Sequence, residues 1–78
     1  MQARSNRAAP VAANLKFALK EAGMTQEALA REIDVGLRVV QAWCGGRVLP
    51  RWPRLVLIAR ALDRDPSWFY ADHDAAPA

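Results

Sequence analysis

The sequence predicts one small all-α domain of five short helices, and three observations lead to this prediction. Apolar residues recur at three- and four-residue spacing in successive segments, as they do on the buried face of a helix. Threonine, aspartate, proline and glycine stand where these segments begin and end, in positions that helix caps favour. With 78 residues the chain is one domain at most, and an all-helical packing with short loops suits so small a core.

The first helix is expected to follow a flexible N-terminal arm formed by residues 1–9, which show no periodicity. Pro10 marks its start, because proline is favoured at the first helical position. Gly23 marks its end, because glycine adopts the left-handed conformation that closes a helix. The buried face is predicted to comprise Val11, Leu15, Ala18, Leu19 and Ala22.

The second and third helices are predicted to form a closely joined pair. Thr25 is expected to cap the second helix, which ends near Ile33. A turn of about three residues, 34–36, leads to the third helix at residues 37–44. Two consecutive glycines follow at once, and since each costs roughly 1 kcal/mol inside a helix, they mark its end. The expected inward side chains of the third helix are Val40 and Trp43.

A loop at residues 47–52 separates this pair from two further helices. Pro53 is expected to open the fourth helix, and Asp65 to cap a short fifth one with Pro66 at its first position. The predicted inward residues of the fourth helix are Leu55, Val56, Ile58, Ala59 and Leu62. The folded domain is therefore expected over residues 10–71, followed by a flexible tail at residues 72–78.

Positive charge is concentrated in the middle of the chain. The formal net charge is +3, and the sequence pI is about 9.8. From Gly36 to Arg54 there are four arginines and no acidic residue: Arg38, Arg47, Arg51 and Arg54. DNA carries one negative charge per about 1.7 Å of helix axis, so it would be attracted to such a segment.

Other classes of protein find little support in the sequence. The single cysteine, Cys44, rules out an internal disulfide, fits a reducing cytoplasm and gives no support for a metal site. No apolar run approaches the roughly 18 residues of a membrane span, and no signal peptide is expected. There is no set of catalytic residues and no phosphate-binding glycine loop, so we expect no enzyme activity, cofactor or small-molecule substrate.

The second and third helices carry a recognisable pattern. The segment from Thr25 to Ala30 reads Thr-Gln-Glu-Ala-Leu-Ala, and the pattern continues with Val35, Val40, Trp43, Gly46 and Pro50. Downstream come Leu55, Ile58, Ala59, Ala61, Leu62 and then Asp65, Pro66, Ser67 and Trp68. In this the chain resembles the Cro/phage-repressor type (lambda repressor-like, XRE-type) of helix-turn-helix DNA-binding protein over about residues 11–70.

The resemblance implies a compact lambda repressor-like domain of five helices whose third helix enters the major groove of double-stranded DNA. The residues implied to approach bases are Gly36, Leu37, Arg38, Gln41 and Ala42. Those implied to hold phosphates are Thr25, Gln26, Arg47, Arg51 and Arg54. A possible dimer interface comprises Trp52, Trp68, Phe69 and Tyr70, although part of this aromatic cluster would instead close the core.

Two departures from the family pattern stand out. Positions that usually carry polar base readers are Leu37, Val39 and Ala42 here, so only Arg38 and Gln41 offer hydrogen bonds to bases. Leu37 or Ala42 would instead touch a thymine methyl group. The second departure is an apolar pair, Leu19 and Cys44, at positions where relatives often have a basic and an acidic residue that form an ion pair. Replacing a buried ion pair by apolar residues is often neutral for stability.

The expected function is that of a sequence-specific transcriptional regulator in the bacterial cytoplasm or nucleoid. The resemblance favours a phage or prophage Cro-like repressor that acts as a homodimer on a palindromic operator. Two alternatives remain open at this point. One is an antitoxin-type regulator, and the other is a protein-interaction module that keeps the fold without binding DNA.

Overall fold

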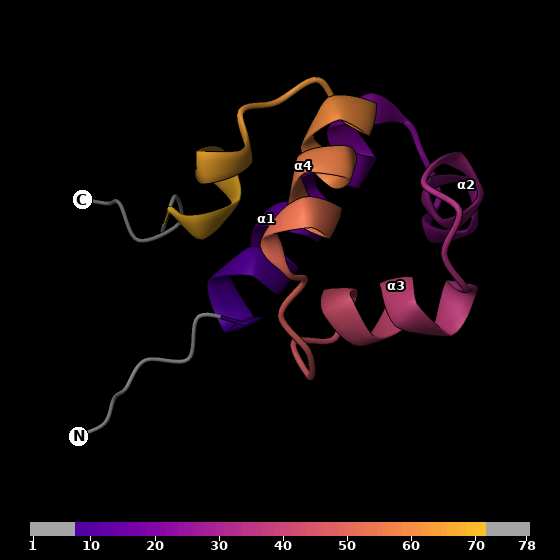
Figure 1. Ribbon diagram of the computed structural model, residues 1–78. Coiled ribbons are helices and arrows are strands. Elements are labelled where there is room, and N and C mark those ends of the chain that lie inside the picture. Colours follow the sequence, from indigo (N-terminus) through magenta and orange to yellow (C-terminus); the bar gives the residue numbers. More distant parts are fainter. Residues whose placement is uncertain (1–7, 72–78) are drawn as a thin grey trace.

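The computed structural model describes residues 8–71, and this part of the chain is entirely helical, with no strand (Figure 1). The elements are α1 (Ala8–Ala22), α2 (Gln26–Glu32), α3 (Leu37–Cys44), α4 (Trp52–Ala61) and a short 3-10 helix, η1 (Pro66–Tyr70). The pair α2 and α3 packs together, α3 also packs on α1, and η1 lies against α1 and α4. The all-α prediction is therefore confirmed.

The number of α-helices differs from the prediction. Four α-helices are present in the described residues, and the expected fifth helix is a 3-10 helix. Its backbone bonds span three residues, as from Trp68 N to Asp65 O at 2.9 Å. The expected cap is present, since the Asp65 side chain accepts hydrogen bonds from the amide and hydroxyl of Ser67.

The ends of the chain follow the prediction only in part. The helix α1 begins at Ala8, so residues 8 and 9 belong to it and not to an arm. Pro10 is tolerated in this first turn because amides there lack a helical partner in any case. The remainder of the expected arm and the whole of the expected tail lie outside the described residues.

One apolar core holds these elements together, and every element contributes to it. The largest fully buried apolar side chains include Leu15, Leu29, Val40, Leu55, Ile58 and Phe69. Burying a side chain of this size contributes about 1.5–3 kcal/mol. The predicted inner faces are largely confirmed, except that Ala22 is exposed and Val56 is half-buried.

The four α-helices end in the same way. Each is followed by one residue with positive φ, and the next amide reaches back to the carbonyl five residues earlier, as in a Schellman motif. Gly23 was predicted for this position after α1, and Gly46 takes it after α3 with φ 77°. Asp34 and Asp63 take it after α2 and α4, with φ of 59° and 58°. The chain therefore turns sharply after each helix without long loops.

Asn14 joins the two ends of the described chain. Its side chain is buried in α1, and Nδ2 donates hydrogen bonds to the carbonyl oxygens of Phe69 at 2.8 Å and Ala71 at 2.7 Å. The amide therefore satisfies carbonyls at the end of η1 that the 3-10 pattern leaves free. Sequence reasoning missed Asn14, because a lone polar residue at an inward position gives no sign of its partner.

We expect Asn14→Ala to lower the free energy of unfolding by about 2 kcal/mol, because it leaves buried carbonyls without donors. Chemical denaturation of the full chain measures this change. In Asn14→Asp the introduced carboxyl faces carbonyl oxygens, so its pKa is raised in the folded state. Stability of that variant is then greatest below the ordinary carboxyl pKa of about 4 and falls as the pH rises above it. Equal denaturation midpoints for Asn14→Ala and the natural chain would contradict the role given to this amide.

Candidate nucleic-acid interface

The segment from α2 to α3 is built as a tight corner between two short helices. Thr25 caps α2, and its Oγ1 accepts a hydrogen bond from the Ala28 amide at 3.0 Å, which confirms the predicted cap. In the turn, the Val35 amide donates to the Ala30 carbonyl at 2.9 Å. Ala30 is buried and Val35 is half-buried against the core, so small and compact side chains let the helices cross closely.

The inner side of α3 determines which side chains point outward. Val40, Trp43 and Cys44 are all buried, with exposed fractions of at most 4%. Since successive residues are about 100° apart around a helix, the opposite side is centred on Arg38. Gln41 lies next to it on the same side of α3. The packing of the core thus presents this one helix face to solvent.

The predicted base-contacting residues lie on this outward face. Gly36, the residue that precedes α3, is exposed, and so are Leu37, Arg38 and Gln41. Ala42 is half-buried and offers the least surface. We call the exposed side formed by Leu37, Arg38, Val39 and Gln41 the α3 face.

Arg47 is held at the end of α3. The left-handed backbone of Gly46 turns the chain at the end of α3 and so brings Arg47 back toward the helix. A Cβ at Gly46 would lie 3.7 Å from the Cβ of Ala12, so this turn packs against α1. A Cβ at Gly45 would lie 3.4 Å from Nη1 of Arg47, so the guanidinium folds back over the C-terminus of α3. A positive charge at that end is favourable to the helix dipole. It also places a cation beside the α3 face.

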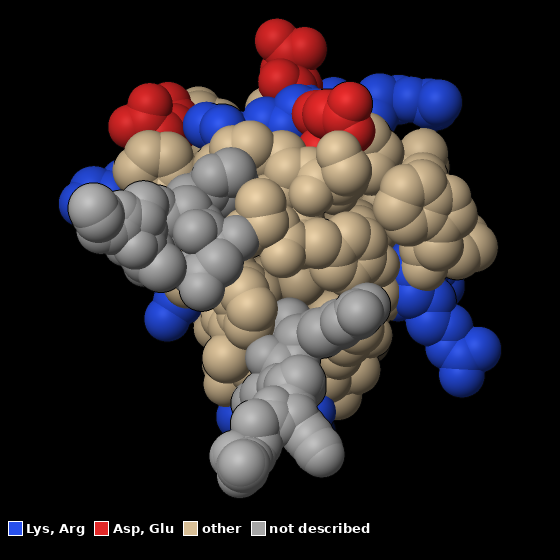
Figure 2. Space-filling view, turned by 90° about the vertical axis from the view of Figure 1, so that its left-hand side faces the viewer, with Lys and Arg blue, Asp and Glu red and all other residues tan. Residues whose placement is uncertain are grey.

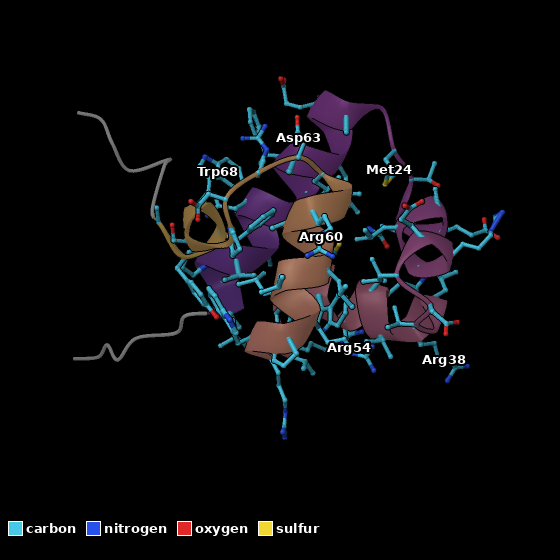
Figure 3. All side chains as sticks on the ribbon, turned by 45° about the horizontal axis from the view of Figure 1, so that its top comes forward. Met24, Arg38, Arg54, Arg60, Asp63 and Trp68 are labelled. Carbon is cyan, nitrogen blue, oxygen red and sulfur yellow. The ribbon has the colours of Figure 1, made fainter. Side chains whose placement is uncertain are left out.

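Two more of the predicted phosphate-binding arginines come from the start of α4. Arg51 is the residue that precedes α4, and Arg54 is in its first turn; both are exposed. Figure 3 shows Arg54 and Arg38 on the same lower side of the molecule, whereas Asp63 lies at the opposite end. No acidic residue occurs between positions 35 and 62 of the sequence. Arg38 and Arg54 thus lie on one side of the molecule, away from Asp63.

The remaining predicted phosphate contacts, Thr25 and Gln26, lie at the first turn of α2. Thr25 is exposed and uses its oxygen as the helix cap, which leaves its hydroxyl proton available to a phosphate. Gln26 is half-buried.

The aromatic residues near η1 divide into buried and exposed members. Phe69 is fully buried, so its inclusion in a dimer interface was wrong: its ring fills the core of the monomer. Trp52 is 54% exposed and stacks on Tyr70, with ring centroids 6.4 Å apart.

A second aromatic pair lies on η1 and α1. The Trp68 ring is 6.2 Å from that of Phe17, an exposed residue that sequence reasoning did not single out. The guanidinium of Arg64 lies 4.0 Å from the centre of the Trp68 ring, a cation–π contact. On the side where η1 lies, Figure 2 shows uncharged side chains in the middle and charged ones around the rim, among the described residues in view. We call the surface of Phe17, Trp52, Trp68 and Tyr70 the aromatic face.

A short helix, a tight turn and a second short helix with an outward basic face define a helix-turn-helix domain of the kind that binds DNA. The helix-turn-helix family matches residues 15–69, so the chain belongs to this family, in its Cro/phage-repressor (lambda repressor-like) type. It is thus a DNA-binding transcription regulator by family.

The fold is shared with a solved repressor structure. The solution structure of the SOS-response transcriptional repressor LexA from Eubacterium rectale superposes with a TM-score of 0.84 and 21% sequence identity. The match covers 99% of this chain and 82% of that one. No curated protein sequence matches this chain. None of the helices in residues 8–71 combines the length and apolar character that crossing a membrane requires.

The predicted core thiol is confirmed, since Cys44 is buried behind the α3 face. Burial raises the pKa of the Cys44 thiol, and the positive charge of Lys16 lowers it by a smaller amount. The thiol therefore stays protonated at neutral pH, and the reactive thiolate is scarce.

We expect iodoacetamide to modify Cys44 at least about 100-fold more slowly in the native protein than in guanidinium chloride, because reaction requires opening of the core. Mass spectrometry over time measures both rates. The raised pKa also predicts that stability declines as the pH rises beyond the ordinary cysteine pKa of about 8.5. Native and denatured proteins that react equally fast would show that the thiol is accessible.

Proposed function

We propose that this protein is a transcriptional repressor that binds duplex DNA with α3 in the major groove. The observation that carries the proposal is the burial of Val40, Trp43 and Cys44, which turns Arg38 and Gln41 outward in a stretch of chain that has four arginines and no acidic residue. The major groove admits an α-helix and displays a distinct set of donors and acceptors for each base pair.

Each polar group has a role in this proposal. Arg38 donates two hydrogen bonds to O6 and N7 of a guanine, and Gln41 pairs with N6 and N7 of an adenine. Gly36 and Ala42, without bulky side chains, allow the groove edge to come close. Arg47, Arg51 and Arg54 bind phosphates, as do Thr25 and Gln26 at the start of α2.

The proposed form on DNA is a homodimer on a palindromic operator, with the aromatic face as its interface. Trp52 and Phe17 are each about half exposed, and their rings lie against Tyr70 and Trp68, so the aromatic face offers apolar surface that a second copy would bury. Two linked half-sites raise affinity and specificity together. A phage or prophage Cro-like repressor in the bacterial cytoplasm fits this form; the similar LexA structure is likewise that of a transcriptional repressor.

A second candidate is a protein-interaction module, and the exposure of Leu37 and Val39 favours it. Such a module would show no preference among duplexes. Selection of bound sequences from a random duplex pool separates the two functions, and failure to enrich any duplex at low salt would overturn the repressor proposal.

Arg38→Ala is expected to relax selection at one base pair and to weaken binding by about 1–3 kcal/mol, because a bidentate base contact is lost. Arg47→Ala is expected to weaken binding to all sequences alike. It should also reduce the slope of the logarithm of the association constant against the logarithm of salt concentration by about one. Fluorescence anisotropy on matched and mutated duplexes, over a salt series, measures both. Arg60→Ala, which removes an exposed arginine of α4 outside the proposed DNA contacts and the aromatic face, is the control and should leave base preference unchanged.

For the dimer, we expect Trp68→Ala to weaken self-association at least tenfold and operator binding with it, because aromatic anchors dominate such interfaces. Sedimentation equilibrium measures the association. Phe17→Ala, which changes an exposed side chain with less risk to the fold, should act in the same direction. A natural chain that stays monomeric and occupies one half-site would contradict the dimer.

A further inference from the structure

We infer that the α3 face selects thymine by contacting its 5-methyl group with Leu37 and Val39. The inference rests on the proposed function and specifies which bases the same site recognises. It goes beyond the hydrogen bonds of Arg38 and Gln41, because it assigns base selection to two side chains that cannot form any.

The two residues are exposed in an unusual place for large apolar side chains. Leu37 is 38% exposed and Val39 is 42% exposed, although both belong to the first turn of α3. They lie about 100° to either side of Arg38 around the helix. Neither belongs to the buried cluster or to the apolar residues packed against it. Both therefore offer apolar surface to a ligand of the α3 face.

Their position limits what they meet on DNA. The first turn of a recognition helix reaches base edges in the major groove, and there the thymine methyl is the apolar group that the four base pairs offer. A cytosine amino group pressed against Leu37 or Val39 would lose its water without gaining a hydrogen bond. Base pairs with thymine toward these side chains are therefore preferred over those with cytosine.

The small number of polar readers strengthens this argument. Arg38 and Gln41 can each specify one base pair, and Ala42 is half-buried and carries only a methyl group. The half-site is thus expected to have one pair read by Arg38, with thymines on the base pairs next to it that Leu37 and Val39 contact.

The test uses the full chain and the duplex enriched by selection, with single thymines replaced by deoxyuridine, which lacks only the methyl group. At a contacted thymine we expect dissociation constants to rise about fourfold, the effect of one buried methyl group. Leu37→Ala should abolish the difference between thymine and uracil at one contacted position and keep it at the other, and Val39→Ala should do the reverse. Leu57→Ala is the matched control: this leucine is 36% exposed but lies on α4 beside Ile33 and Arg60, and its variant should keep the full difference.

The outcomes distinguish this inference from the function on which it rests. Enrichment of a duplex whose uracil derivatives all bind as tightly as the thymine parent overturns the methyl contact alone. A uracil effect that persists unchanged in both Leu37→Ala and Val39→Ala overturns the assignment to these residues. Failure to enrich any duplex overturns the proposed function and this inference with it. Circular dichroism confirms that each variant is folded before its affinity is compared.

Discussion

The burial of one side of α3 is the constraint on which the rest of the arrangement depends. Helices of seven and eight residues, such as α2 and α3, are too short to be stable in water by themselves, where about 12–15 residues are already marginal. They exist because Val40 and Trp43 fill the space between α1 and α2. The same contacts set the rotation of α3 about its axis. Stability and the orientation of Arg38 are therefore consequences of one packing interaction.

Much of this could be read from the sequence because the information is local. The bounds of α3 were predicted correctly, since a glycine precedes the helix and two glycines follow it, and these residues act on the backbone within one turn. The cap formed by Thr25 is local in the same sense. The family match over residues 15–69 reflects the joint spacing of these signals.

The features that escaped prediction depend on contacts between distant residues. Asn14 and Phe69 are 55 positions apart, and no local pattern links them. The 3-10 form of η1 is also absent from the local signals, since the Asp65 cap and Pro66 mark the start of a helix but not its hydrogen-bond pattern. Likewise, Phe17 and Trp52 remain about half exposed although each contacts an aromatic ring of η1. Periodicity can identify an aromatic residue as apolar, but it cannot say which of two apolar neighbours the core has room for.

The two left-handed aspartates, Asp34 and Asp63, have a consequence for how this protein can evolve. A left-handed backbone costs an ordinary residue roughly 1–2 kcal/mol, less for aspartate, and a negative charge at a helix C-terminus is also unfavourable. Glycine would relieve both penalties at either position, and neither residue belongs to the α3 face. Replacing Asp34 or Asp63 by glycine would thus raise the stability of the fold. A lineage that acquires such a glycine can tolerate destabilising substitutions in the recognition helix, and so bind new operators without losing the fold.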